Sequence, residues 1–119
     1  MQGISFKAWR GPHYVTVAEL LPLLGDSARG LRWRVECEER WDLAAELERR
    51  SAGEGMDTPT LLALVGPAVQ LVDAEATGYA DGEPVVVLTE FDSTLWEIRV
   101  ADERLLDRFS DRYPDAAPL

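Results

Sequence analysis

The chain contains one histidine and one cysteine, His13 and Cys37, and this pair is the first candidate for covalent chemistry. A histidine beside a cysteine can take the thiol proton and leave a nucleophilic thiolate. Cys37, however, alternates with Trp33 and Val35 on the apolar side of a predicted strand, and a thiol buried in apolar surroundings is usually inert. The sequence therefore favours a loop or packing role for His13, and it predicts no catalytic residue.

Carboxylates are the second candidate for chemistry, because 22 Asp and Glu residues face only 12 Lys and Arg. Two neighbouring carboxylates can act as general acid and base. Their spacing does not match an Asp-rich calcium loop, and one cysteine cannot form a thiolate metal cluster. The segment Gly53-Glu54-Gly55 lacks the Lys-Ser/Thr of a phosphate-binding loop. We therefore expect no metal and no other cofactor, and we regard an enzyme as less favoured than a binding protein.

Alternating apolar and polar residues predict the strands that must position these groups. The alternation is clear at residues 4–9 and at residues 31–38, where one side is apolar and the other charged. The segment from Val69 to Val100 predicts three further strands. Asp81-Gly82 is a strong hairpin signal between two of them, and Asp92-Ser93 can turn the chain again.

Helical spacing of apolar residues predicts four helices, which begin near Thr16, Trp41, Thr58 and Asp102. Thr16 and Glu19 fit a capping box. The resulting order is β-α-β-α-α-β-β-β-α, and its three consecutive strands favour an antiparallel meander. The sequence predicts a single domain over residues 1–119 with an α+β fold, in which helices pack on one face of a mostly antiparallel five-stranded sheet.

The sheet face opposite the helices is the one candidate interaction surface. Alternation places Trp9, Tyr79 and Leu95 on this face among charged residues, and aromatic anchors amid charges are typical of protein interfaces. A one-residue slip in strand register would invert every assignment. The predicted partner-binding residues are Trp9, Arg34, Glu36, Glu38, Asp73, Glu75, Tyr79, Leu95 and Glu97.

Two alternative interpretations of this face remain open. The carboxylates on it can be balanced across strands by Arg32, Arg34 and Arg99, which would leave an ordinary solvated surface. A second copy of the chain can also cover the face, so a homodimer is possible. Exposure of Trp9 together with Tyr79 on one sheet face is the structural observation that would favour a partner surface.

The charge of the chain limits the partners. A net charge of −10 repels nucleic acid phosphates and anionic membranes, so we expect neither as a partner. We predict a cytoplasmic, non-enzymatic protein-binding domain whose partner has a basic surface. Immunity and antitoxin-type proteins have this size and charge, although no motif supports the comparison. The alternative is a small enzyme or ligand-binding protein with a pocket between sheet and helices, Asp/Glu acid–base chemistry, and the loop 53–57 as a lid.

Overall fold

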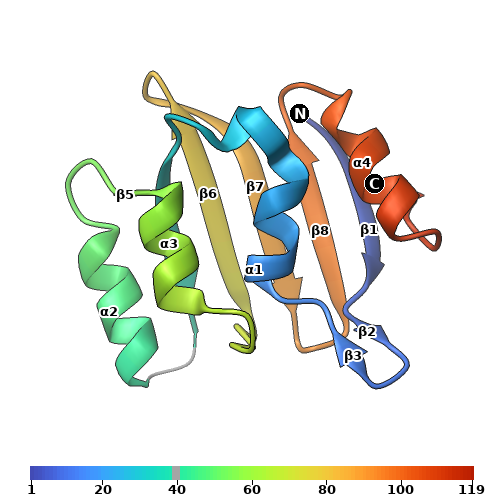
Figure 1. Ribbon diagram of the computed structural model, residues 1–119, viewed down its shortest axis with the longest axis horizontal. Coiled ribbons are helices and arrows are strands. Elements are labelled where there is room, and N and C mark those ends of the chain that lie inside the picture. The colour runs from blue at the N-terminus through green and yellow to red at the C-terminus, as the bar shows by residue number, and fades with distance from the viewer. Residues whose placement is uncertain (39–40) are drawn as a thin grey trace.

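The computed structural model of the protein describes residues 1–38 and 41–119. Within them, seven strands form one antiparallel sheet in the order β5-β4-β6-β7-β8-β1-β9, and two more form a separate hairpin, β2-β3 (Figure 1). The strands are β1 (Gln2–Lys7), β2 (Trp9–Arg10), β3 (His13–Tyr14), β4 (Arg32–Cys37), β5 (Met56–Asp57), β6 (Ala74–Ala80), β7 (Glu83–Phe91), β8 (Leu95–Val100) and β9 (Ala117–Pro118).

The helices lie on one side of the sheet, in front of it in Figure 1. They are α1 (Val17–Leu20), the 3₁₀ helix η1 (Leu21–Ala28), α2 (Asp42–Arg50), α3 (Thr58–Val65) and α4 (Leu105–Arg112). The core lies between the two layers, where Trp33 and Trp96 of the sheet are buried with Leu20, Leu61 and Phe109 of the helices. None of the helices in the described residues is long and apolar enough to cross a membrane.

Side-chain caps set two helix starts. Thr16 Oγ1 accepts a hydrogen bond from the Glu19 amide at 3.2 Å, as the capping box predicts. The α3 cap is Asp57, whose carboxylate accepts a hydrogen bond from the Thr60 amide, and not Thr58, the first residue of the helix. Thr58 Oγ1 instead accepts from Trp33 Nε1 at 2.8 Å and donates to a backbone carbonyl. Thr58 therefore gives the buried indole N–H of Trp33 a hydrogen-bond acceptor, and an N–H buried without one would cost folding free energy.

The prediction of a mixed α+β chain with a large antiparallel sheet is confirmed, but the prediction of five strands is wrong. The additional strands β2, β3, β5 and β9 each have two residues, too few for an alternation to be visible. The first strand of the meander begins at Ala74 and not at Val69, because Asp73 has a φ of 49°, which no strand residue adopts.

The tight turn between β7 and β8 contains a strained residue. The amide of Thr94 donates to the carbonyl of Phe91 at 2.8 Å, and both central residues, Asp92 and Ser93, have positive φ (48° and 59°). Such a turn favours glycine at its second central position.

We expect Ser93→Gly to raise the free energy of unfolding by about 0.5–1 kcal/mol, because glycine adopts positive φ without steric cost. The variant keeps the hydrogen bond that the backbone amide of residue 93 donates to Glu90. Urea denaturation of both proteins measures the change. A lower stability of the variant would show that the Ser93 side chain contributes more than its backbone strain costs.

Candidate protein-binding face

The sheet face that the helices leave uncovered, here called the open face, carries a row of acidic residues. On β4, Trp33 is buried against the helices while Glu36 is exposed on the opposite side. The register places Glu36 opposite Glu75, Glu75 opposite Thr89, and Thr89 opposite Glu97. These four residues form the acidic row, which crosses β4, β6, β7 and β8 at right angles to the strands.

Six of the nine predicted residues lie on the open face by register and alternation, and two lie at its edge. Glu38 follows β4 and Asp73 precedes β6, and the Glu38 amide donates to the Asp73 carbonyl at 3.2 Å. Both residues therefore adjoin the end of the acidic row. The six on the face are Arg34, Glu36, Glu75, Tyr79, Leu95 and Glu97.

Trp9 does not continue the first strand, so the predicted placement on the sheet face is wrong. β1 ends at Lys7. The Ala8 amide donates a hydrogen bond to the Thr94 carbonyl, and the Ala8 carbonyl accepts one from the Val15 amide. Trp9 then lies in the β2-β3 hairpin, where its ring packs edge-on against Tyr14 with centroids 5.2 Å apart. Its side chain is 45% exposed, but on the hairpin and not within the open face beside Tyr79.

The arginines of β4 contact the loop that follows α2. Arg32 donates to the carbonyls of Glu54 and Gly55, and Arg34 donates to the carbonyl of Gly53. Gly53 and Gly55 have positive φ (63° and 79°), and a Cβ on Gly55 would lie 2.6 Å from a backbone oxygen of Trp33. Glycine at these positions thus lets the loop approach β4. The two arginines thus hold the loop 53–57 against β4 in the structure.

Arg32, Arg34 and Arg99 therefore do not pair with the carboxylates at the β4–β6 end of the acidic row. Arg34 lies over the Tyr79 ring, 5.6 Å from its centroid, and Arg99 pairs with Glu97 at 3.0 Å. Among the ion pairs between described residues, none includes Glu36, Glu38, Asp73 or Glu75. Directly opposed like charges destabilise a sheet, so the Glu36–Glu75 pair costs folding free energy.

A hollow of about 330 Å³ lies on the open face where β4 ends and β6 begins, beside Glu36 and Glu75. Phe91, at the end of β7, contributes an exposed ring to it, and sequence reasoning missed this residue. The signal was present, since Phe91 alternates with Leu88 and Glu90 in the same way as Val87 and Thr89. The carboxylate residues that line the hollow are Glu36, Glu38, Asp73, Glu75 and Glu90.

Glu90 is the buried support of this end of the sheet, with 1% of its surface exposed. It accepts hydrogen bonds from the Tyr14 hydroxyl, from the Asp73 amide at 3.2 Å and from the Ser93 amide at 3.1 Å. Asp73 in turn accepts from the Asp92 amide at 2.8 Å. One carboxylate thus connects the β2-β3 hairpin, the segment before β6 and the β7-β8 turn.

Tyrosine ionisation should make the fold sensitive to alkali. Burial, reinforced by the hydrogen bond and charge of Glu90, raises the pKa of Tyr14 well above its ordinary value of 10.0. Burial also raises the pKa of Tyr113. The unfolded chain therefore loses these protons first as the pH rises, so the stabilisation is complete below about pH 10 and is lost above it.

We expect the free energy of unfolding to fall above pH 10 by up to about 1.4 kcal/mol per pH unit for each of these tyrosines. Tyr14→Phe should make this fall less steep, because one of the two groups is gone. Urea denaturation at several pH values between 8 and about 11.5 gives the slope of the free energy of unfolding against pH for each protein. Equal slopes for the two proteins would show that Tyr14 ionises alike in the folded and unfolded states.

Comparison with known proteins gives no relative for this chain. No family model, no curated protein and no solved structure matches it. Within residues 1–38 and 41–119, no group of three or more His, Cys, Asp or Glu residues could hold a metal ion.

Proposed function

We propose that the protein is a small, acidic, non-enzymatic binding domain whose open face takes up a basic surface of a partner protein. The observation that carries the proposal is the opposed pair Glu36 and Glu75. Their charges repel each other across two paired strands, and Arg32, Arg34 and Arg99 have other partners. An incoming Lys or Arg side chain would relieve this repulsion and form charge-assisted hydrogen bonds.

The rest of the open face supports a protein partner over a small cation. Val85, Val87 and Leu95 are half-buried on it, and Phe91 is 40% exposed beside the acidic hollow. Apolar and aromatic side chains on both sides of a charged row offer a partner protein both kinds of contact found in protein interfaces. Phe91 is the aromatic side chain best placed to anchor such a partner.

The net charge of −10 supports the same proposal at longer range. A surface this acidic attracts basic proteins and accelerates their association, whereas it repels nucleic acids. An inhibitor of the immunity or antitoxin type, which covers the basic active site of a nuclease, is the form of binding protein that we propose. Such a protein needs no catalytic residue of its own.

Co-expression with the products of neighbouring genes, followed by purification at two salt concentrations, tests this proposal. We expect a basic protein to be retained at low salt and to associate more slowly as the salt concentration rises, because screening weakens the attraction. Retention of no basic protein at either salt concentration would contradict the proposal. Retention of an acidic or neutral protein with no salt dependence would also contradict it.

A further inference from the structure

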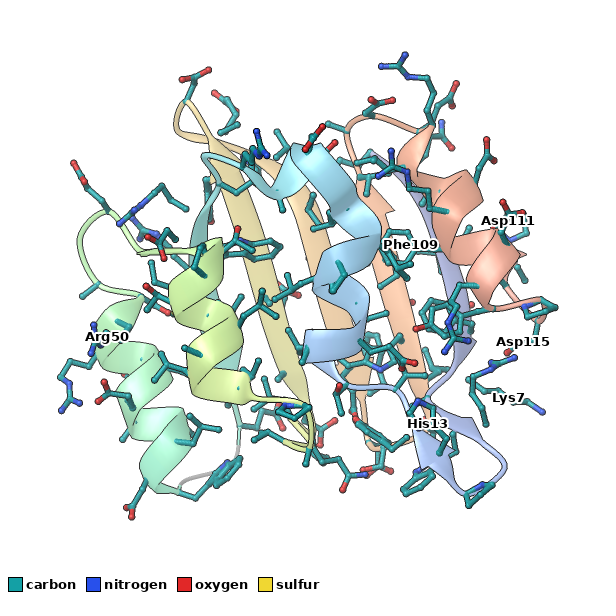
Figure 2. The ribbon with its side chains drawn as sticks, viewed as in Figure 1. Lys7, His13, Arg50, Phe109, Asp111 and Asp115 are labelled. Carbon is teal, nitrogen blue, oxygen red and sulfur yellow. The ribbon has the colours of Figure 1, made fainter. Side chains whose placement is uncertain are left out.

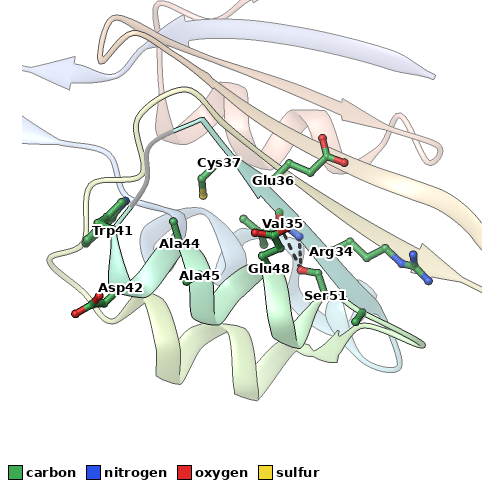
Figure 3. Close-up of a pocket in the computed structure, with 11 residues that line it drawn as sticks. Arg34, Val35, Glu36, Cys37, Trp41, Asp42, Ala44, Ala45, Glu48 and Ser51 are labelled. Carbon is green, nitrogen blue, oxygen red and sulfur yellow. Dashed lines mark hydrogen bonds between the residues drawn. The ribbon is translucent and has the colours of Figure 1, made fainter.

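A second cavity is a groove of about 650 Å³ between β4 and α2, which adjoins the edge of the open face at Arg34 and Glu36 (Figure 3). Ligand pockets in proteins have volumes of this order. One end of the groove is closed by Ser51, whose Oγ accepts from the Val35 amide at 2.8 Å and donates to the Leu47 carbonyl at 2.7 Å. The other end is at Trp41, the residue before α2.

The lining of the groove is about half polar and half apolar, and both α2 and β4 contribute to its apolar part. α2 presents Ala44 and Ala45, whose short side chains leave the space open, and β4 contributes Val35 and Cys37. Trp41 is 39% exposed, so its indole ring is available at the mouth. An apolar or aromatic body fits this lining better than a strongly hydrated ligand does.

Three acidic residues and one arginine line the groove: Glu36, Asp42, Glu48 and Arg34. Figure 3 shows Glu48 directed between α2 and β4, and none of the ion pairs between described residues includes it. The adjacent Arg49 and Arg50 both pair with Glu46. Arg34 also lines the groove, but its guanidinium is bound to the Gly53 carbonyl.

We propose that this groove binds a small organic cation, an amine or amidine with an aromatic body. The cationic group lies at the Glu48 carboxylate, and the aromatic body lies against Ala44, Ala45 and the Trp41 ring. The opposite charge of Glu48 attracts the cationic group, while the Trp41 ring offers the aromatic body a surface to stack on. The groove shares Glu36 with the acidic row at its margin, whereas Trp41, Ala45 and Glu48 lie outside the row. The inference does not depend on the proposed partner.

The test is a titration of the full chain with benzamidine, followed by NMR on the Trp41 indole and the amides of α2. Benzamide, which has the same shape without the charge, is the matched ligand. We expect benzamidine to shift the signals of Trp41, Ala44, Ala45 and Glu48 with a Kd on the order of 1 mM. Benzamide should bind at least about tenfold more weakly, because it lacks the charge that meets Glu48.

Two variants separate this site from general electrostatic attraction. Glu48→Gln should reduce the affinity for benzamidine to that for benzamide, while Glu46→Gln, on the same helix but outside the groove, should leave it within about twofold. Ala45→Leu should abolish the shifts by filling the groove, and leucine is compatible with the exposed helix. Equal binding of the two ligands, an unchanged Kd in Glu48→Gln, or shifts confined to the open face would overturn the inference.

Discussion

Replacing Glu90 with alanine should lower the free energy of unfolding by about 3 kcal/mol. The side chain is buried, and it accepts hydrogen bonds from the Tyr14 hydroxyl and from the amides of Asp73 and Ser93. Alanine would leave these three donors without their partner, and each unpaired buried donor costs about 1–3 kcal/mol before water enters the site. Urea denaturation, analysed by linear extrapolation, measures the change.

Two further variants make this prediction specific to the buried network. Glu90→Gln keeps one carbonyl oxygen as acceptor and should cost less, about 1–2 kcal/mol. Glu83→Ala, at the exposed start of the same strand, should change stability by no more than about 0.5 kcal/mol. If Glu90→Ala lowers the free energy of unfolding by less than about 0.5 kcal/mol, the three donors find other partners. That result would contradict the role of Glu90 as the buried support of this end of the sheet.

Glu75→Lys should stabilise the fold while it weakens binding of the basic partner. The substitution places Lys opposite Glu36 and beside Thr89 in the acidic row. A repulsive cross-strand pair becomes an attractive one, so the free energy of unfolding should rise by about 0.5–1 kcal/mol. The same change puts a cation where the partner presents its own cations, and we expect the Kd to rise at least about tenfold.

The matched control is Glu83→Lys, which makes the same charge change on the exposed first residue of β7, outside the acidic row. Both variants alter the long-range field equally, so any difference in their Kd reports the position of the charge. We expect Glu83→Lys to change the Kd by about threefold or less, mainly through the association rate. An equal loss in the two variants would show that net charge, and not the acidic row, determines binding.

The sequence was most informative where a pattern was local. The alternation from Leu31 to Glu38 correctly separates Trp33 and Val35, which are buried, from Arg34 and Glu36, which are exposed. The Asp81-Gly82 turn joins β6 and β7 with positive φ at both residues, as its dipeptide predicts. These local signals were sufficient to assign the acidic side of β4.

Contacts between distant segments were not predictable in this way. Arg32 and Arg34 were expected to balance carboxylates on the neighbouring strand, but they bind carbonyls about 20 residues further along the chain. That choice depends on where the glycines of the loop place their carbonyls, which no pattern reports. It also changes the electrostatics of the face, because Glu36 and Glu75 lose their expected counter-ions.

The placement of Trp9 failed for a related reason, and the burial of Glu90 was not predicted at all. The period-two pattern of β1 extends formally through Trp9, but the chain bends at Ala8 and begins a two-residue strand. The same pattern on β7 would bury Glu90 behind Val86 and Leu88, which is unfavourable for an isolated carboxylate. Its burial becomes acceptable only through Tyr14 and Asp73, whose positions follow from the fold as a whole.

The position of the captured partner on the sheet tests the central claim most directly. Methyl cross-saturation NMR on the complex distinguishes Val85, Val87 and Leu95 on the open face from Leu23 and Leu62 on the helix side, all half-buried in the free protein (Figure 2 shows the side chains around the ribbon). We predict that the open-face methyl signals lose intensity when the partner is saturated and that the helix-side signals do not. Loss confined to the helix-side methyls would contradict the assignment of the open face as the binding surface.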